Sequence, residues 1–275
     1  MELLQGRRGL VIGVANERSL AYAIAGAAHD AGARLALTYQ NEKLASRVAK
    51  LGDQLGADLV TACDVTNAAA LDALVSDLQE RWGALDFLVH SVAYADRDAL
   101  AGRLLDTPRD AFLGAVEVSV YSLVATVRAC EPLLRASDGA PSVLTLTYQG
   151  SQHAVPNYHL MGVSKAGLEA AVRYLAAELG PDGIRVNALS PGPIKTLSAA
   201  GIPGLRRMLA HTQKNAPLRR NTTHADVAGA ALYCLSDLSQ GTTGEVVHVD
   251  AGYNVVGGGA PLDPAAATNG GGSTS

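Results

Sequence analysis

Seven short runs of apolar residues alternate along the chain with longer segments whose apolar residues recur at helical spacing. Runs that are apolar throughout are typical of strands buried on both faces. Strand–helix alternation predicts parallel βαβ units with right-handed crossovers. We therefore expect an α/β fold: one doubly wound, Rossmann-type domain with a seven-stranded parallel sheet, helices on both faces and a ligand site at the carboxyl ends of the strands. The expected strands are Gly9–Val14, Arg34–Thr38, Asp58–Ala62, Phe87–His90, Ser142–Thr147, Arg185–Leu189 and Val246–Asp250.

One domain accounts for most of the chain. A length of 275 residues suits a single large α/β domain, which we place at residues 1–256. Residues 257–275 are rich in Gly, Ala, Ser and Thr and are expected to form a disordered tail. Residues 196–218 combine Gly and Pro with short helical stretches after the sixth strand, which predicts a mobile cover over the substrate or, alternatively, a plain surface excursion. The expected helices are Ser19–Ala31, Asn41–Leu55, Ala68–Trp82, Arg109–Leu134, Tyr158–Leu179 and His224–Leu235.

Charge and cysteine content exclude several classes of protein. The net charge of -4 gives no footprint for nucleic acid or a membrane surface. No apolar run looks long enough to span a bilayer and the first residues do not resemble a signal peptide, so we expect a cytoplasmic protein. The cysteines Cys63, Cys130 and Cys234 lie far apart, which predicts buried thiols in a reducing compartment and no metal site.

The turn after the first strand lies where a Rossmann-type fold binds phosphate. Gly13 permits a tight turn and close approach of a pyrophosphate, and Ser19 can cap the following helix. After the fourth strand, Ser91 and Ala93 are small enough to pass beneath a nucleotide. The turn lacks the full G-x-G-x-x-G pattern, so an ordinary strand-to-helix turn with a serine cap is the alternative.

The ends of the second and third strands indicate which nucleotide is bound. A ribose 2′-phosphate calls for a nearby arginine, and Gln40 instead offers a hydrogen bond to a ribose hydroxyl. This favours NADH over NADPH, and Lys43 is the one nearby residue that argues the other way. Asp64 and Val65 are placed to hold the adenine, or Asp64 caps the helix that begins near residue 68.

Two candidate catalytic residues follow the fifth strand. Tyr158 and Lys165 are seven residues apart, which is two turns along one face of a helix. A nearby ammonium group favours the ionised form of a tyrosine and strengthens it as an acid. The pair suits a reaction in which an oxygen gains negative charge, although a surface pair on an amphipathic helix shows the same spacing.

With these motifs in place, the chain resembles the short-chain dehydrogenase/reductase superfamily and, within it, bacterial enoyl-[acyl-carrier-protein] reductases of the FabI type. The resemblance runs from residue 6 to about residue 256. It rests on Gly13-x5-Ser19-x-Ala21, Thr38-Tyr39-Gln40-Asn41, Cys63-Asp64-Val65, Leu144 to Tyr148, Pro156-Asn157-Tyr158 through Lys165, Arg185 to Ala188, Gly192 to Thr196 and Gly244 to Asp250.

The chain departs from the carbonyl-reducing members of that superfamily in its catalytic residues. Those members resemble Ser…Tyr-x-x-x-Lys with an asparagine on an earlier helix. With Lys165 as the fixed point, the usual tyrosine position holds Met161, the serine position Tyr148 and the asparagine position about Ser119. Enoyl reductases resemble this chain, with their own tyrosine at Tyr158. This change in the position of the tyrosine suits an enoyl thioester. In a ketone the carbon that accepts hydride carries the oxygen, whereas in an enoyl thioester that carbon is the β-carbon, two carbons from the carbonyl carbon.

The resemblance implies NADH-dependent reduction of trans-2-enoyl thioesters carried on acyl carrier protein, by a homotetramer. Tyr158 would donate a hydrogen bond to the developing enolate oxygen, and Lys165 would hold the nicotinamide ribose. Tyr148, the third residue assigned to catalysis, would line the pocket and orient the thioester. Arg206 and Arg207 would meet the acidic carrier. Further cofactor contacts are expected from Leu20, Ile194 and Thr196, and acyl-chain contacts from Ala95, Met161, Ala199 and Ile202.

Two other functions stay open on the sequence. One is a carbonyl reductase or alcohol dehydrogenase on the same fold, against which Met161 argues because its thioether cannot donate a proton. The other is a nucleotide-sensing protein with an inactive site, against which the Tyr158 and Lys165 pair argues. Turnover of a ketone in place of an enoyl thioester would identify the first, and NADH binding without turnover the second.

Overall fold

A parallel sheet of seven strands forms the centre of the computed structural model, which describes residues 2–196, 199 and 204–257. The strand order is β3-β2-β1-β4-β5-β6-β7, and every neighbouring pair is parallel. This confirms the doubly wound fold, and the expected strands agree with the observed ones to within two residues at each end. The strands are β1 (Arg8–Ile12), β2 (Arg34–Tyr39), β3 (Leu59–Ala62), β4 (Phe87–His90), β5 (Ser142–Leu146), β6 (Arg185–Pro191) and β7 (Val246–Val249).

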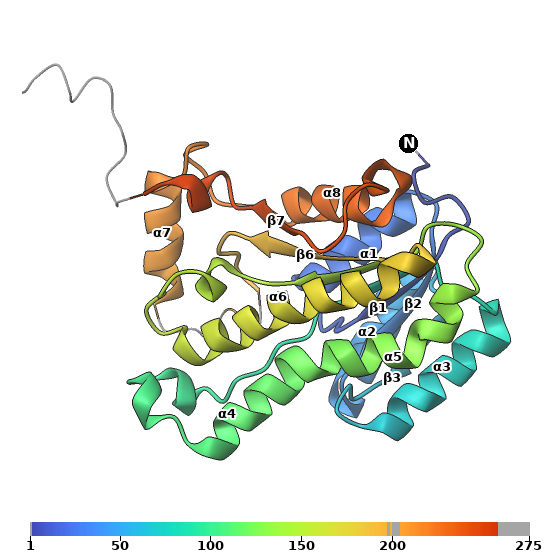
Figure 1. The fold of residues 1–275 in the computed structure, drawn as a ribbon, viewed down its shortest axis with the longest axis horizontal. Coiled ribbons are helices and arrows are strands. Elements are labelled where there is room, and N and C mark those ends of the chain that lie inside the picture. The colour runs from blue at the N-terminus through green and yellow to red at the C-terminus, as the bar shows by residue number, and fades with distance from the viewer. Residues whose placement is uncertain (1, 197–198, 200–203, 258–275) are drawn as a thin grey trace, which may run out of the picture.

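Helices cover both faces of the sheet (Figure 1). Side chains of α3, α5 and α6 form one apolar core on one face, and those of α1, α2 and α8 form a second core on the other. Cys130 lies in the first core and Cys234 in the second. All three cysteines are buried free thiols, as predicted. The helices are α1 (Leu20–Asp30), α2 (Glu42–Gln54), α3 (Ala68–Trp82), α4 (Arg109–Val116), α5 (Ser122–Arg135), α6 (His159–Leu179), α7 (Leu205–Asn215) and α8 (His224–Leu235).

The expected helix over residues 109–134 contains an irregular turn. Between α4 and α5 the backbone forms a π turn at Glu117–Tyr121, so that the chain remains helical but one turn is widened. The widened turn contains the fully buried Ser119, whose Oγ accepts a hydrogen bond from the Tyr94 amide at 3.1 Å and lies 3.2 Å from the Tyr94 carbonyl oxygen to which it donates. The turn thereby fixes the segment that follows β4.

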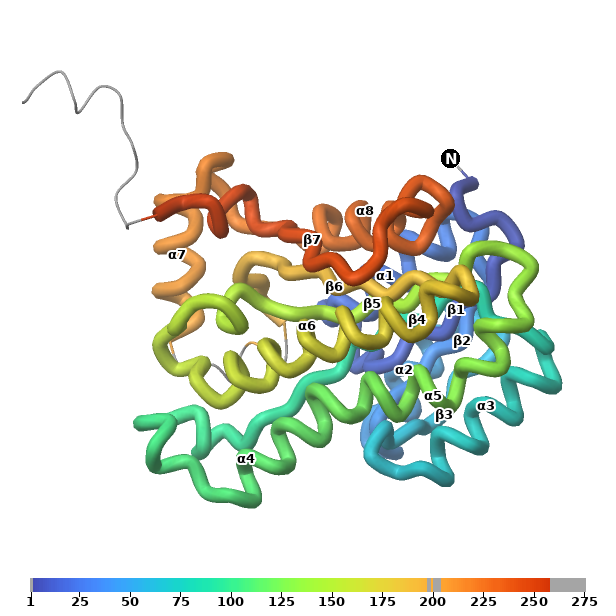
Figure 2. Tube along the Cα trace, in the orientation of Figure 1, coloured from blue at the N-terminus to red at the C-terminus, as the bar shows by residue number. Residues whose placement is uncertain are grey.

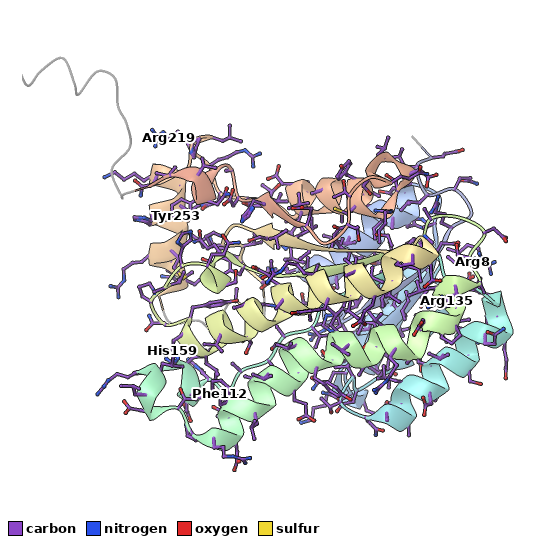
Figure 3. All side chains as sticks on the ribbon, viewed as in Figure 1. Arg8, Phe112, Arg135, His159, Arg219 and Tyr253 are labelled. Carbon is purple, nitrogen blue, oxygen red and sulfur yellow. The ribbon has the colours of Figure 1, made fainter. Side chains whose placement is uncertain are left out.

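The carboxyl ends of the strands all lie at one end of the molecule (Figure 2). The side chains labelled in Figure 3 mark the two ends: Arg8 and Arg135 lie at the amino ends of the strands. At the opposite end, His159 lies at the start of α6 and Tyr253 lies beside α7. A third, smaller apolar cluster lies at that opposite end and contains Tyr148, Tyr158 and Met161. Sheet order reverses between β1 and β4, which places a crevice at this end of the sheet.

Candidate active site

A cavity of about 400 Å³ opens at the carboxyl ends of the strands. It extends from the turn after β1 to the start of α6, and it is walled by the segments that follow β4 and β6. Most of the residues predicted to bind cofactor or substrate line this one cavity. They are Gly13, Ser19, Leu20, Ser91, Ala93, Ala95, Tyr148, Tyr158, Met161, Lys165, Ile194, Thr196 and Ala199.

The turn after β1 is shaped for close approach of a ligand. Gly13 has a φ of 95°, and a Cβ added there would lie 2.2 Å from the carbonyl oxygen of Ser91. The Oγ of Ser19 accepts a hydrogen bond from the Tyr22 amide at 3.2 Å and so caps α1, whose amino end faces the cavity. A bare glycine backbone beside a helix amino terminus is the arrangement that binds a dinucleotide pyrophosphate, so these residues fit that group.

The residues predicted to contact the adenosine end, Gln40, Asp64 and Val65, lie at the ends of β2 and β3 and outside the main cavity. Gln40 is exposed there. The alternative role of Asp64 as the cap of α3 is wrong, because the side chain of Asn67 accepts from the Ala69 and Ala70 amides instead. Asp64 forms its own turn, accepting from the amide and hydroxyl of Thr66 at 3.0 and 2.8 Å.

Lys165 lies in α6 and is 5% exposed. Its Nζ donates a hydrogen bond of 2.7 Å to the carbonyl oxygen of Leu146, the last residue of β5, and lines the cavity with its remaining donors available. Burial lowers the pKa of Lys165 to about 8, and the negative charge of Glu169 one turn farther along α6 opposes this change. The ammonium group of Lys165 is therefore held at a fixed point beneath the cavity, and its pKa lies close to neutral pH.

Tyr158 and Tyr148 form the wall opposite the turn after β1. Their rings pack edge to face with centroids 4.8 Å apart. Helix α6 begins at His159, so Tyr158 is its cap residue. The spacing had instead indicated that Tyr158 lies in the first turn of the helix. The prediction that Lys165 favours ionised Tyr158 is wrong for this structure: burial, with Tyr148 beside it, raises the pKa of Tyr158 above its ordinary value. Tyr158 is a neutral hydrogen-bond donor.

Two glycines let the segment after β5 pack directly on α6. A Cβ on Gly150 would lie 2.5 Å from the ring of Tyr158. A Cβ on Gly162 would lie 2.6 Å from the carbonyl oxygen of Gly150. The Gly162 amide donates to the Tyr158 carbonyl oxygen at 2.6 Å, which ties the Tyr158 backbone to the first turn of α6. The position of the Tyr158 ring therefore requires glycine, which has no Cβ, at both residue 150 and residue 162.

His90, at the end of β4, is buried near Lys165 and is neutral. Its Nδ1 lies 3.1 Å from Thr145 Oγ1, and its Nε2 lies 2.8 Å from Ser122 Oγ. Burial and the neighbouring charge of Lys165 lower the pKa of His90 to about 3. His90 thus joins β4, β5 and α5 behind the cavity without adding a charge to it.

The cavity also contains residues that the sequence did not single out. Arg97 and Leu100 enter from the segment after β4, and Leu205 and Met208 enter from α7. The last two are three residues apart, a helical spacing of apolar residues inside the expected cover. Helix α7 thus brings the described part of the cover to the cavity. Ile202, predicted to touch the acyl chain, lies outside the described residues, as do residues 258–275 of the expected tail.

The fold and cavity define a nicotinamide-nucleotide oxidoreductase of the short-chain dehydrogenase/reductase class, with its tyrosine ahead of the usual position. The model of the enoyl-(acyl carrier protein) reductase family matches residues 13–254. The chain belongs to this family. The enoyl-[acyl-carrier-protein] reductase [NADH] 1 of Rhizobium meliloti is 51% identical over 255 residues, which cover 93% of each chain.

Solved structures of such reductases share the fold in detail. The reductase of Anaplasma phagocytophilum in complex with NAD matches with a TM-score of 0.89 and 47% identity, covering 95% of this chain and 96% of that one. The Bacillus cereus reductase with NADP+ and an indole naphthyridinone matches with a TM-score of 0.90 and 46% identity, covering 94% of this chain and 100% of that one. Both nicotinamide nucleotides thus occur in similar structures.

Proposed function

We propose that this protein reduces the carbon–carbon double bond of trans-2-enoyl thioesters, carried on acyl carrier protein, with NADH as the reductant. Membership of the enoyl-(acyl carrier protein) reductase family supports the reaction. The observation that carries the proposal for this chain is that Tyr158 and Lys165 line one cavity with the Gly13 turn, while Met161 occupies the position of a carbonyl reductase's proton donor. Such a site favours an enoyl thioester over a ketone.

The cofactor is proposed to lie along the cavity from the turn after β1 to α6. The Gly13 turn and the amino end of α1 take the pyrophosphate, and Lys165 takes the nicotinamide ribose. Further contacts come from Ser91, Ala93, Ile194 and Thr196 around the rings, and from Gln40, Asp64 and Val65 at the adenosine end. When bound, NADH supplies the hydride that reduces the double bond.

The protein's contribution is to position the thioester and to stabilise its developing charge. Hydride addition at the β-carbon leaves negative charge on the thioester oxygen, and a proton taken up from solvent at the α-carbon then gives the saturated thioester. The neutral hydroxyl of Tyr158 donates a hydrogen bond to that oxygen, and this bond strengthens as the charge develops. Lys165 keeps the electric field positive at this corner, and Tyr148 packs against Tyr158 so that its ring stays in place. Because both rings are buried, these interactions act in a region of low dielectric constant, where electrostatic interactions are stronger than in water.

The acyl chain is proposed to occupy the apolar part of the cavity. Met161 and Ala95 form one side of it, and Leu205 and Met208 of α7 form the other. Residues 196–218 act as the cover and 1–256 as one catalytic domain. An apolar wall built partly from a separate helix can adjust to acyl chains of different length, because only Leu209, Thr212 and Asn215 of α7 are buried.

We propose a homotetramer, and the exposed apolar residues of α4, α6 and the π turn support it. Leu113, Tyr121 and Tyr174 are 46%, 51% and 73% exposed on elements that lie side by side (Figure 1). By length and composition the continuous helix Arg109–Arg135 could cross a membrane, contrary to the expectation from the sequence. The inner face of this helix, which includes Leu123, is buried against the sheet. We propose that its apolar outer face packs on a second subunit rather than in a membrane. We therefore place the protein in the cytoplasm.

The carrier is proposed to dock at the amino end of α7. Arg206 and Arg207 are both exposed there. Arg207 also lines a second cavity of about 500 Å³ together with His153 and His211, and Tyr148 and Met208 form part of the walls of both cavities. A basic entrance next to the catalytic cavity suits an acidic carrier protein.

The test is the loss of NADH absorbance when a trans-2-enoyl thioester is added to the protein. We expect turnover with crotonyl thioesters and none with simple ketones. Turnover of ketones alone would identify a carbonyl reductase. Binding of NADH without turnover of any enoyl substrate would identify a nucleotide-binding protein and refute the proposal.

A further inference from the structure

Glu169 is a buried carboxylate on the same face of α6 as Lys165, one turn farther along the helix. It is 6% exposed and is not among the residues that line the catalytic cavity. Placing a carboxylate in a protein interior costs free energy unless hydrogen bonds and a nearby positive charge compensate. Its surroundings supply both, which points to a specific role.

The hydrogen bonds of Glu169 reach across to the segment that carries Tyr148. Its Oε1 accepts from Thr147 Oγ1 at 2.7 Å and from Ser151 Oγ at 2.5 Å. Thr147 immediately precedes Tyr148, and Ser151 ends the 3-10 turn Gln149–Ser151 that follows it. One carboxylate oxygen therefore holds both ends of the short stretch that contains Tyr148.

Lys165 contacts the same strand end from the neighbouring turn of α6. Its Nζ donates to the carbonyl oxygen of Leu146, the residue before Thr147. The two α6 side chains thus hold consecutive residues at the end of β5. Gly150 lies in the held stretch and contacts the ring of Tyr158, so the same interactions also determine where Tyr158 lies.

The charge of Glu169 acts on Lys165 as well. Burial lowers the pKa of Lys165 to about 8, and Glu169 counters that shift by favouring the ammonium form. His90 on β4 also faces this corner, with a pKa lowered to about 3 by burial and by Lys165. Burial raises the pKa of Tyr158 and of Tyr148 above their ordinary values. Lys165 is therefore the group of this set that titrates between about pH 7 and 9.

We propose that Glu169 is a positioning residue for the reaction, which holds the Tyr148 stretch against α6 and keeps Lys165 positively charged at neutral pH. Glu169 acts through these residues and contacts neither substrate nor cofactor. The inference rests on the proposed role of Lys165 as the ribose ligand. The two fail differently: if Lys165 does not bind the ribose, Lys165→Ala leaves the NADH affinity unchanged.

The experiment measures the dissociation constant of NADH from pH 6 to pH 9.5 for three variants. Glu169→Gln keeps an oxygen that can accept from both hydroxyls and removes the negative charge. Glu178→Gln removes a carboxylate from an exposed position of the same helix and is the matched control. Ser151→Ala removes one donor to Glu169 and leaves the charge.

For Glu169→Gln we expect the alkaline loss of NADH affinity to move to lower pH, because Lys165 loses its proton more easily without the neighbouring carboxylate. Binding should weaken about tenfold at pH 8.5 and change less than about twofold at pH 6, since one pH unit corresponds to a factor of ten. Glu178→Gln should match the unaltered protein throughout.

For Ser151→Ala we expect kcat for the enoyl thioester to fall about threefold, as for loss of one hydrogen bond. The pH at which NADH affinity is lost should stay the same, because the charge of Glu169 is retained. The proposal is overturned if Glu169→Gln and Glu178→Gln agree at every pH. It is equally overturned if Glu169→Gln loses affinity by the same factor at pH 6 and pH 8.5, because that result describes a general structural defect.

Discussion

Replacing Tyr158 by phenylalanine is expected to lower kcat roughly a hundredfold or more while leaving the fold intact. The ring contributes to packing, since it lies edge to face with Tyr148 at 4.8 Å and against Gly150, and phenylalanine keeps that ring. The only group lost is the hydroxyl, a neutral donor in a cavity where the side chain is 7% exposed. Loss of a donor aimed at a developing oxyanion typically costs on the order of 2.7–4 kcal/mol, or about 10²–10³ in kcat.

We place the effect at the lower end of that range because a thioester enolate spreads its charge over more than one atom. The KM for the thioester and the dissociation constant of NADH should change much less, since the bond strengthens only as charge develops. Steady-state kinetics with a crotonyl thioester, alongside NADH titration, measure the three quantities. Met161→Tyr should not restore activity to Tyr158→Phe, because its hydroxyl enters the cavity at a different point.

Tyr148→Phe is the matched control, because it removes the hydroxyl of the tyrosine that packs on Tyr158. That hydroxyl accepts from Gln149 Nε2 at 3.3 Å and is expected to affect kcat only mildly. Full activity of Tyr158→Phe together with loss of activity in Tyr148→Phe would assign the catalytic role to Tyr148 and refute the reasoning.

Three further predictions concern the cofactor, the assembly and the carrier. NADH should give a higher kcat/KM than NADPH because Gln40 offers no charge to a 2′-phosphate; equal values in steady-state assays would refute this. Light scattering should report a tetramer at micromolar concentration, and Tyr174→Glu with Tyr121→Glu should shift it toward smaller species by placing charge on the exposed apolar face; a monomer before substitution would contradict the assembly. Reversing the charges of Arg206 and Arg207 should raise the KM for carrier-linked thioesters, with less effect on coenzyme A thioesters; equal losses on both substrates would argue against carrier docking.

The strands and the chemistry of the site could be predicted because each depends on local sequence. A strand buried on both faces needs an uninterrupted apolar run, which is visible without the structure, and β4 agrees residue for residue with its prediction. Gly13 was found from its position after the first strand, and Tyr158 and Lys165 from their separation of seven residues together with the family resemblance. The cap of α3 was missed because Asp64 and Asn67 both favour turns, and only the backbone geometry decides which of them accepts from the helix.

Other parts of the site depend on contacts between distant segments. Glu169 reads as one more polar residue of a helix, and its partners Thr147 and Ser151 are 22 and 18 residues away in sequence. The raised pKa of Tyr158 arises from burial beside Tyr148, which spacing does not reveal. The π turn around Ser119 is a feature of backbone hydrogen bonding that the sequence pattern does not indicate, and Ser119 contacts Tyr94 from a different segment.

The contact between Gly150 and Gly162 restricts how this enzyme can evolve. Every amino acid that a single nucleotide change can reach from a glycine codon carries a Cβ, and at either position that atom would overlap the Tyr158 ring or the neighbouring backbone. Amino-acid substitution therefore has no neutral first step at these two positions. Changes in substrate range have more room at the surrounding cavity wall, at positions such as Ala95, Met161 and Met208, where the side chain is not in the Gly150–Gly162 contact that positions Tyr158.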